Sequence, residues 1–104
     1  MSAGLWLSEG EVVAMMSLPE AIEALRDGLR EEAAGQAANM VKTHATWANG
    51  STLHAIGAVF ERAGLVGTKT WAHTAHGAMP LLVLIDAENG SVRSIIEAFA
   101  LGQM

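Results

Sequence analysis

The strongest constraint on the fold is the pair Asn49-Gly50, which separates two segments rich in β-forming residues, 41–48 and 52–60. Asn-Gly is typical of a two-residue type I′ turn, whose central residues both need a positive φ angle. We therefore predict a hairpin in which Ala48 faces Ser51 and Lys42 faces Gly57. Because side chains alternate along a strand, this register puts Lys42, His44 and Thr46 on one face with Leu53, Ala55 and Gly57.

Four further segments complete the predicted sheet. Asn89-Gly90 predicts a second hairpin between residues 81–85 and 92–96, and residues 65–72 form a strand that carries Gly67, Lys69 and Trp71 on one face. The run 81–85 is continuously apolar, which predicts a strand covered on both faces. Leu5, Trp6 and Leu7 predict a short edge strand.

The first third of the chain has the signals of two helices. Ser8 with Glu11 and Ser17 with Glu20 each form a Ser-x-x-Glu capping box. The second helix is predicted to run to about Ala34, before Gly35. Its apolar side chains recur at steps of three and four residues, so we expect them to cover a flat surface: Leu18, Ile22, Leu25, Leu29 and Ala33. Residues 97–104 begin another helix.

Length and composition narrow the class of protein. A chain of 104 residues is enough for one domain, residues 1–104, in which helices pack on an open, largely antiparallel sheet with two hairpins. This is an α+β fold. The net charge of −5 argues against nucleic acid or an anionic membrane as partner. The absence of cysteine excludes thiolate chemistry, and no signal peptide or membrane-length apolar run is present, so a cytoplasmic location is expected.

Lys69 is the first candidate for chemistry. A lysine in mid-strand either reaches solvent at a sheet edge or points into a pocket, where it can bind a carboxylate. Lys42 and His44 share a predicted face and lie on a neighbouring strand, so the two lysines could converge on an anion; a solvated sheet face explains them equally well.

Other motifs point away from metals and nucleotides. His73-x-x-His76 has the spacing of a metal pair, but two histidines alone make a weak site, and we assign no metal. The chain has neither a Gly-x-Gly-x-x-Gly motif nor a P-loop, so we expect no nucleotide cofactor on these residues.

The order of segments resembles the N-terminal half of the ornithine cyclodeaminase and mu-crystallin family. Lys42-Thr43-His44 is similar to a segment that usually reads Arg-Thr-His, and Gly64 to Lys69 resembles the strand that carries the family's lysine. The remaining similar segments are Leu5 to Glu9 with Val12, Pro19 to Leu25, Gly50 to His54, Leu82 to Asp86 with Gly90, and Ala98 to Met104.

The resemblance implies a function that the residues alone do not. It implies the substrate-binding and dimerisation half of an NAD- or NADP-dependent oxidoreductase or deaminase, which acts on an amino acid or a cyclic imine or ketimine carboxylate. The family's Rossmann domain, which holds the cofactor, is absent from these 104 residues, so we expect the chain alone to be a truncated, inactive form. A homodimer through the β-sheet is implied, with neither nucleic acid nor membrane as partner.

Site residues follow from the same resemblance. Lys69 matches the family lysine at the reacting centre and is assigned as the catalytic residue; Lys42, Lys69 and His44 are assigned to substrate binding. Lys42 stands where an arginine usually grips the carboxylate, and lysine keeps the charge but loses the bidentate fork. The alternative function is a non-catalytic module that binds a small carboxylate or dimerises.

Overall fold

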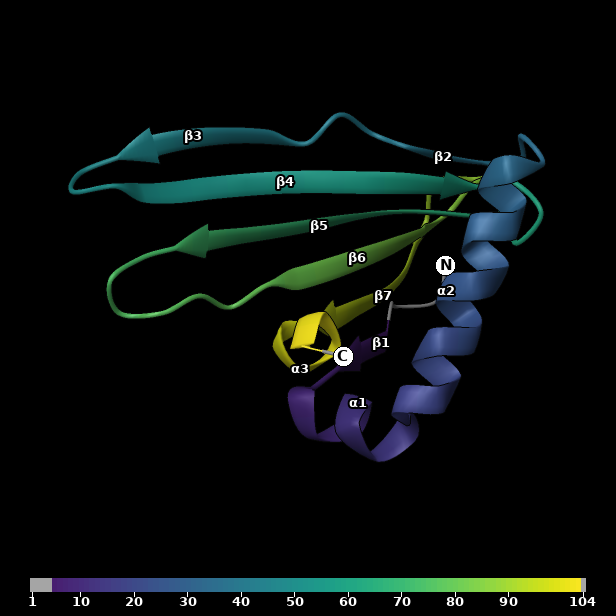
Figure 1. The fold of residues 1–104 in the computed structure, drawn as a ribbon, viewed down its shortest axis with the longest axis horizontal. Helices are drawn as coiled ribbons and strands as arrows, with labels where there is room; N and C mark the ends of the chain where they lie inside the picture. The colour runs from purple at the N-terminus through teal and green to yellow at the C-terminus, as the bar shows by residue number, and fades with distance from the viewer. Residues whose placement is uncertain (1–4, 104) are drawn as a thin grey trace.

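A computed structural model describes residues 5–103, in which three helices lie beside one curved sheet (Figure 1). Met104, the last residue of the predicted C-terminal helix, lies outside the described residues. The elements in chain order are β1 (Leu5–Leu7), α1 (Glu9–Met15), α2 (Leu18–Ala33), β2 (Ala37–Asn39), β3 (Thr43–Trp47), β4 (Ser51–Phe60), β5 (Leu65–His73), β6 (Leu81–Asp86), β7 (Val92–Glu97) and α3 (Phe99–Gln103).

The seven strands form one sheet in the order β1-β7-β6-β5-β4-β2, with β3 also paired to β4. All neighbours are antiparallel except β1 and β7, which run parallel. The predicted α+β class, the open and largely antiparallel sheet and both hairpins are confirmed. The segment 5–7 is confirmed as an edge strand.

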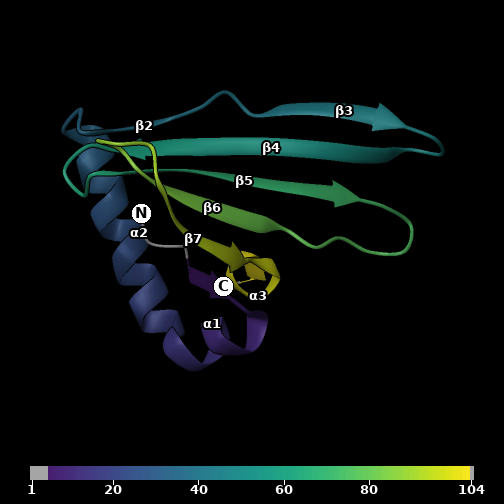
Figure 2. The same ribbon diagram turned by 180° about the vertical axis from the view of Figure 1, so that it is seen from behind.

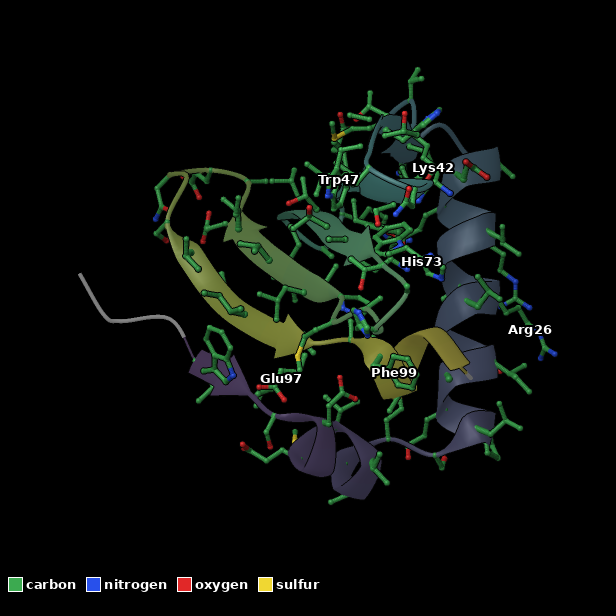
Figure 3. All side chains as sticks on the ribbon, turned by 90° about the vertical axis from the view of Figure 1, so that its left-hand side faces the viewer. Arg26, Lys42, Trp47, His73, Glu97 and Phe99 are labelled. Carbon is green, nitrogen blue, oxygen red and sulfur yellow. The ribbon has the colours of Figure 1, made fainter. Side chains whose placement is uncertain are left out.

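The sheet is curved, and its two faces differ. Figure 3 shows it end-on as an arc whose inner side looks toward α2. The face that carries Lys69, Trp71 and their cross-strand neighbour His54 is called the inner face below, and the opposite one, with Thr68 and Thr70, the outer face. Seen from behind, α2 stands across one end of the strands, while α1 and α3 lie near the β1–β7 edge (Figure 2).

Local sequence signals define the helix ends as predicted. The Ser8 and Ser17 hydroxyls accept the backbone N–H of Glu11 and Glu20, and both capping boxes are complete. The helix α2 ends at Ala33, and two residues later Gly35 takes a φ of +78°, which suits a residue without Cβ. The Gln36 N–H then donates to the carbonyl of Glu31.

The first hairpin has a different register from the predicted one. Trp47 pairs with Ser51 and His44 with His54, so the loop has three residues instead of two. Ala48 and Gly50 take positive φ angles of 35° and 84°, while Asn49 does not, which excludes the type I′ turn. The predicted face was therefore wrong: His44 and Thr46 share a face with His54 and Thr52, because a shift of one residue exchanges the two faces of a strand.

An extra residue separates β2 from β3. Asn39 pairs with Ala58 and Thr43 with Ala55. The chain therefore advances four residues from β2 to β3 while β4 advances only three. This arrangement is a β-bulge over residues 40–42, and it reverses the alternation of side chains. Before the bulge, odd-numbered Asn39 lies on the inner face. After it, the even-numbered residues of β3 lie on that face.

Three other expectations need correction. The apolar stripe of α2 covers no flat surface within residues 5–103, since Leu25 is 64% and Leu29 56% exposed. Instead Gly28 of α2 approaches the ring of Phe60. The strand β6, expected to be covered on both faces, is only half-buried. Glu97, expected to begin the last helix, is the final residue of β7. Among the described residues, Val12 and Ala98 are the buried apolar side chains.

Candidate functional site

Lys69 and Trp71 are the central residues of the candidate site on the inner face. They lie two residues apart on β5, so both side chains leave the same face, as predicted. Trp71 pairs with His54 of β4, and their rings stack with centroids 4.7 Å apart and an interplanar angle of 14°. The Lys69 Nζ lies 4.8 Å from the centroid of the Trp71 ring.

Lys42 reaches the same ring from the bulge between β2 and β3. Its Nζ lies 5.4 Å from the Trp71 centroid, so both ammonium groups lie near one ring; that they bind an anion there stays a prediction. The cause of this proximity differs from the predicted one. With the predicted register, Lys42 would face Gly57, which pairs with Thr68 on the outer face. The turn with one extra residue puts the even-numbered residues of β3 on the inner face, and Lys42, which directly precedes β3, lies on the same face; Figure 3 shows it on the side of the sheet that faces α2.

His54 is half-buried beside Trp71. Its Nε2 lies 2.7 Å from the Thr52 hydroxyl, and its Nδ1 is buried without a hydrogen-bond partner among the described residues. Burial lowers the pKa of His54 below its ordinary value of 6.5, and the nearby Lys42, His44 and His73 lower it further. His54 is therefore neutral near pH 7, which suits a ring stacked on an indole.

The other histidines lie around this centre. The His44 ring is exposed and lies 6.0 Å from the His54 ring. His73 is paired with Thr52 and also lies on the inner face (Figure 3). His76 belongs to the following turn. No three His, Asp or Glu side chains within residues 5–103 lie close enough to hold a metal ion.

Neither lysine of the site has an acidic partner among residues 5–103. Ion pairs in the described part of the chain join Arg26 to Glu23, Arg30 to Asp27 and Arg93 to Asp86, and none involves a lysine. Two ammonium groups thus share one aromatic ring in a protein whose net charge is −5. Such a cluster attracts a small anion, because a carboxylate would supply the missing charge and hydrogen-bond acceptors.

An apolar hollow of about 370 Å³ begins beside Lys69. It lies on the inner face toward α2, and Lys69 and Asn39 are the polar side chains at its edge. The apolar residues that line it include Ile56, Phe60, Leu65, Leu82 and Leu84. A ligand held at Lys69 would therefore have apolar surface on one side.

Two members of the cluster, Trp71 and His54, were not among the predicted site residues. The signal for Trp71 is its position two residues after Lys69 on one strand face. His54 carries no such signal, because its place opposite Trp71 and beside His44 depends on the registers of two strand pairs.

Comparison with solved structures finds proteins of the same fold, whereas comparison by sequence finds no match. No family profile matches the chain, and no curated protein matches it. Several solved structures match, and one is a probable ornithine cyclodeaminase from Bordetella pertussis Tohama I, with a TM-score of 0.87 and 23% identity over 97% of this chain and 32% of that one.

Two others are complexes with nicotinamide cofactors. The iminosuccinate reductase of Paracoccus denitrificans, with NAD+, has a TM-score of 0.87 and 18% identity over 94% of this chain and 33% of that one. The Δ1-pyrroline-2-carboxylate reductase of Thermococcus litoralis, with NADH and L-proline, has a TM-score of 0.86 and 16% identity over 94% and 33%.

These matches define the fold. Residues 5–103 have the architecture of the N-terminal part of ornithine cyclodeaminase-like enzymes, as the sequence resemblance implied, and the match does not cover the Rossmann domain. The chain spans about a third of the length of the structures it matches. No helix within the described residues has the length and apolar character needed to cross a bilayer.

Proposed function

We propose that this chain is the substrate-binding part of an NAD- or NADP-dependent oxidoreductase or deaminase that acts on an amino acid or a cyclic imine carboxylate. The observation that supports it most is the convergence of Lys42 and Lys69, without acidic partners among residues 5–103, on the inner face of a fold shared with such enzymes. Residues 1–104 act as one domain in this proposal.

Each residue has a defined task. The Lys69 and Lys42 ammonium groups donate hydrogen bonds to the substrate carboxylate, and Lys69 also stabilises charge at the reacting carbon and nitrogen. His44, which is exposed at the rim of the cluster, offers a further donor to the carboxylate. A nicotinamide cofactor would exchange hydride with the substrate; the 104 residues show no nucleotide-binding motif, so by themselves they bind substrate without turning it over.

A homodimer through the sheet is the proposed assembly. The outer face and the sheet edges expose large apolar side chains, among them Trp47, Leu53 and Trp6, each about half exposed. Burying them against a second copy would remove this surface from water. The alternative function, a non-catalytic module that binds a small carboxylate, uses the same two lysines and differs only in needing no cofactor.

Calorimetric titration with L-proline tests the proposal. Lys69→Met removes one charged donor, and we expect binding to weaken at least about tenfold, because a hydrogen bond to a charged group contributes roughly 1.5–3 kcal/mol. Arg26→Met is the matched control, since it removes one positive charge from the far side of α2 (Figure 3). Equal affinities in the wild type and both variants would contradict the assignment of Lys69.

A further inference from the structure

The Trp71 ring is in contact with three other side chains of the candidate site, those of Lys42, Lys69 and His54. The Lys69 Nζ lies 4.8 Å and the Lys42 Nζ 5.4 Å from its ring centroid, and His54 stacks on the ring at 4.7 Å. Lys69 comes from the same strand, His54 from β4 and Lys42 from the bulge before β3. One indole thus touches side chains from three separate segments of the chain.

Two ammonium groups near one ring repel each other, so something must offset their repulsion. Neither lysine forms an ion pair or a hydrogen bond within residues 5–103. The face of an indole carries negative potential and attracts an ammonium within about 6 Å of its centroid. Trp71 is therefore the group that offsets the repulsion in the absence of a bound anion.

The surroundings of the ring fix its position. His54, across the ladder from Trp71, is stacked nearly parallel to it, and the Thr52 hydroxyl beside the imidazole Nε2 limits the rotation of the His54 ring. An indole held in this way is a fixed platform, whereas a lysine side chain alone samples many rotamers in solution. Prior alignment of the two ammonium groups lowers the entropy lost when a carboxylate binds.

We propose that Trp71 is a positioning residue that holds the Lys42 and Lys69 side chains together on the inner face, so that both reach one carboxylate. The inference rests on the proposed function for the identity of the ligand, but the arrangement of the lysines is independent of it. Trp71 itself donates nothing to the substrate and acts through the lysines.

The chain offers an unusually clean measurement, because Lys42 and Lys69 are its only lysines. In protein labelled with [¹³Cε]lysine, two signals report the site and no others overlap them. Protons held over an indole face resonate upfield of those of free lysine. We expect both lysine Hε resonances to be upfield in the wild type, to move toward free lysine in Trp71→Leu, and to lie between the two in Trp71→Phe.

Affinity is the second readout. We expect Trp71→Leu to weaken binding of L-proline about fivefold and Trp71→Phe less, since phenylalanine keeps a smaller aromatic face. Phe99→Leu is the matched control, because Phe99 is an exposed aromatic residue of α3 and neither lysine stacks on it. It should leave both lysine signals unchanged.

Two outcomes would overturn the inference. One is that the Hε resonances of the folded wild type equal those of free lysine, a result that needs no variant. The other is that Trp71→Leu leaves the lysine shifts and the affinity as in the wild type. If L-proline and other small carboxylates fail to bind while the ring-dependent shifts are present, the proposed function fails and the role of Trp71 in aligning the lysines stands.

Discussion

Gly57 of β4 is closely surrounded by other atoms, and replacing it by alanine is a demanding test of the packing around it. A Cβ atom at this position would lie 2.8 Å from the carbonyl oxygen of Gly67 and 2.5 Å from the Sδ of Met40. The Met40 side chain can rotate away, but the Gly67 carbonyl belongs to the paired strand β5 and cannot move without disturbing the ladder.

The sign of the effect follows from two opposing magnitudes. Alanine restricts the unfolded chain more than glycine and by itself stabilises a strand by roughly 0.5–1 kcal/mol. Overpacking in a tight site costs about 1–3 kcal/mol. We therefore expect Gly57→Ala to lower the free energy of unfolding, and each kcal/mol should lower the melting temperature of a domain of this size by roughly 4–8 °C.

Thermal unfolding followed by circular dichroism measures this effect, with Gly10→Ala as the control. Gly10 lies within α1 and a Cβ there would meet nothing within 4 Å, so that variant should gain about 0.5–1 kcal/mol. The Met40 N–H donates to the Gly57 carbonyl at the start of the bulge, so Gly57→Ala should also displace Lys42 and weaken carboxylate binding. A Gly57→Ala protein as stable as the wild type would refute the described packing.

Two other predictions concern ionisable groups. Glu97 accepts hydrogen bonds from the Trp6 indole and the Glu9 N–H, which lower its pKa. Glu97→Ala should therefore lower the midpoint of chemical unfolding more than Glu97→Gln does, and the control Glu88→Ala, in an exposed loop, should leave the midpoint unchanged. Equal midpoints for all three variants would contradict this. The pKa of His54 is lower in the folded state than its unfolded value of about 6.5, so its contribution to stability is complete above that pH and is lost as the pH falls below it. The loss of stability between about pH 6.5 and 5 should be smaller in His54→Gln than in the wild type, and identical profiles would show that His54 does not titrate as described.

Features that depend on neighbouring residues in the sequence could be predicted. The capping boxes at Ser8 and Ser17 are complete within four residues, and Gly35, two residues after the end of α2, takes a positive φ angle. Such signals need no tertiary partner, which is why the bounds of α1 and α2 agree closely with those expected.

Strand register could not be predicted, because it depends on turn geometry that Asn49-Gly50 does not determine alone. A positive φ at Ala48 lengthens the turn by one residue. The bulge over residues 40–42 is an offset between β2 and β3 relative to β4, and nothing in residues 40–42 alone marks it. The offset at the turn decides that Lys42 lies on the same face as Lys69, and the assignment of the two lysines to a binding site stays a prediction.

The surface that covers an apolar face also could not be predicted from the sequence. The stripe of α2 has the spacing of a covered helix face, yet Leu25 and Leu29 are mostly exposed in the described residues. Periodicity shows that a face is apolar, but it does not specify which surface covers it. The same holds for β6, whose continuous apolar run lies in a half-covered sheet.

The most direct test of the proposed function is a titration of [¹³Cε]lysine-labelled chain with L-proline, followed by NMR. The two lysine signals should move together and yield one dissociation constant, because both ammonium groups bind the same carboxylate. The shifts should be suppressed by sodium chloride, as for any exposed ionic contact. If the wild-type signals do not move, or if Lys42 and Lys69 titrate with different constants, the two lysines do not form a shared carboxylate site.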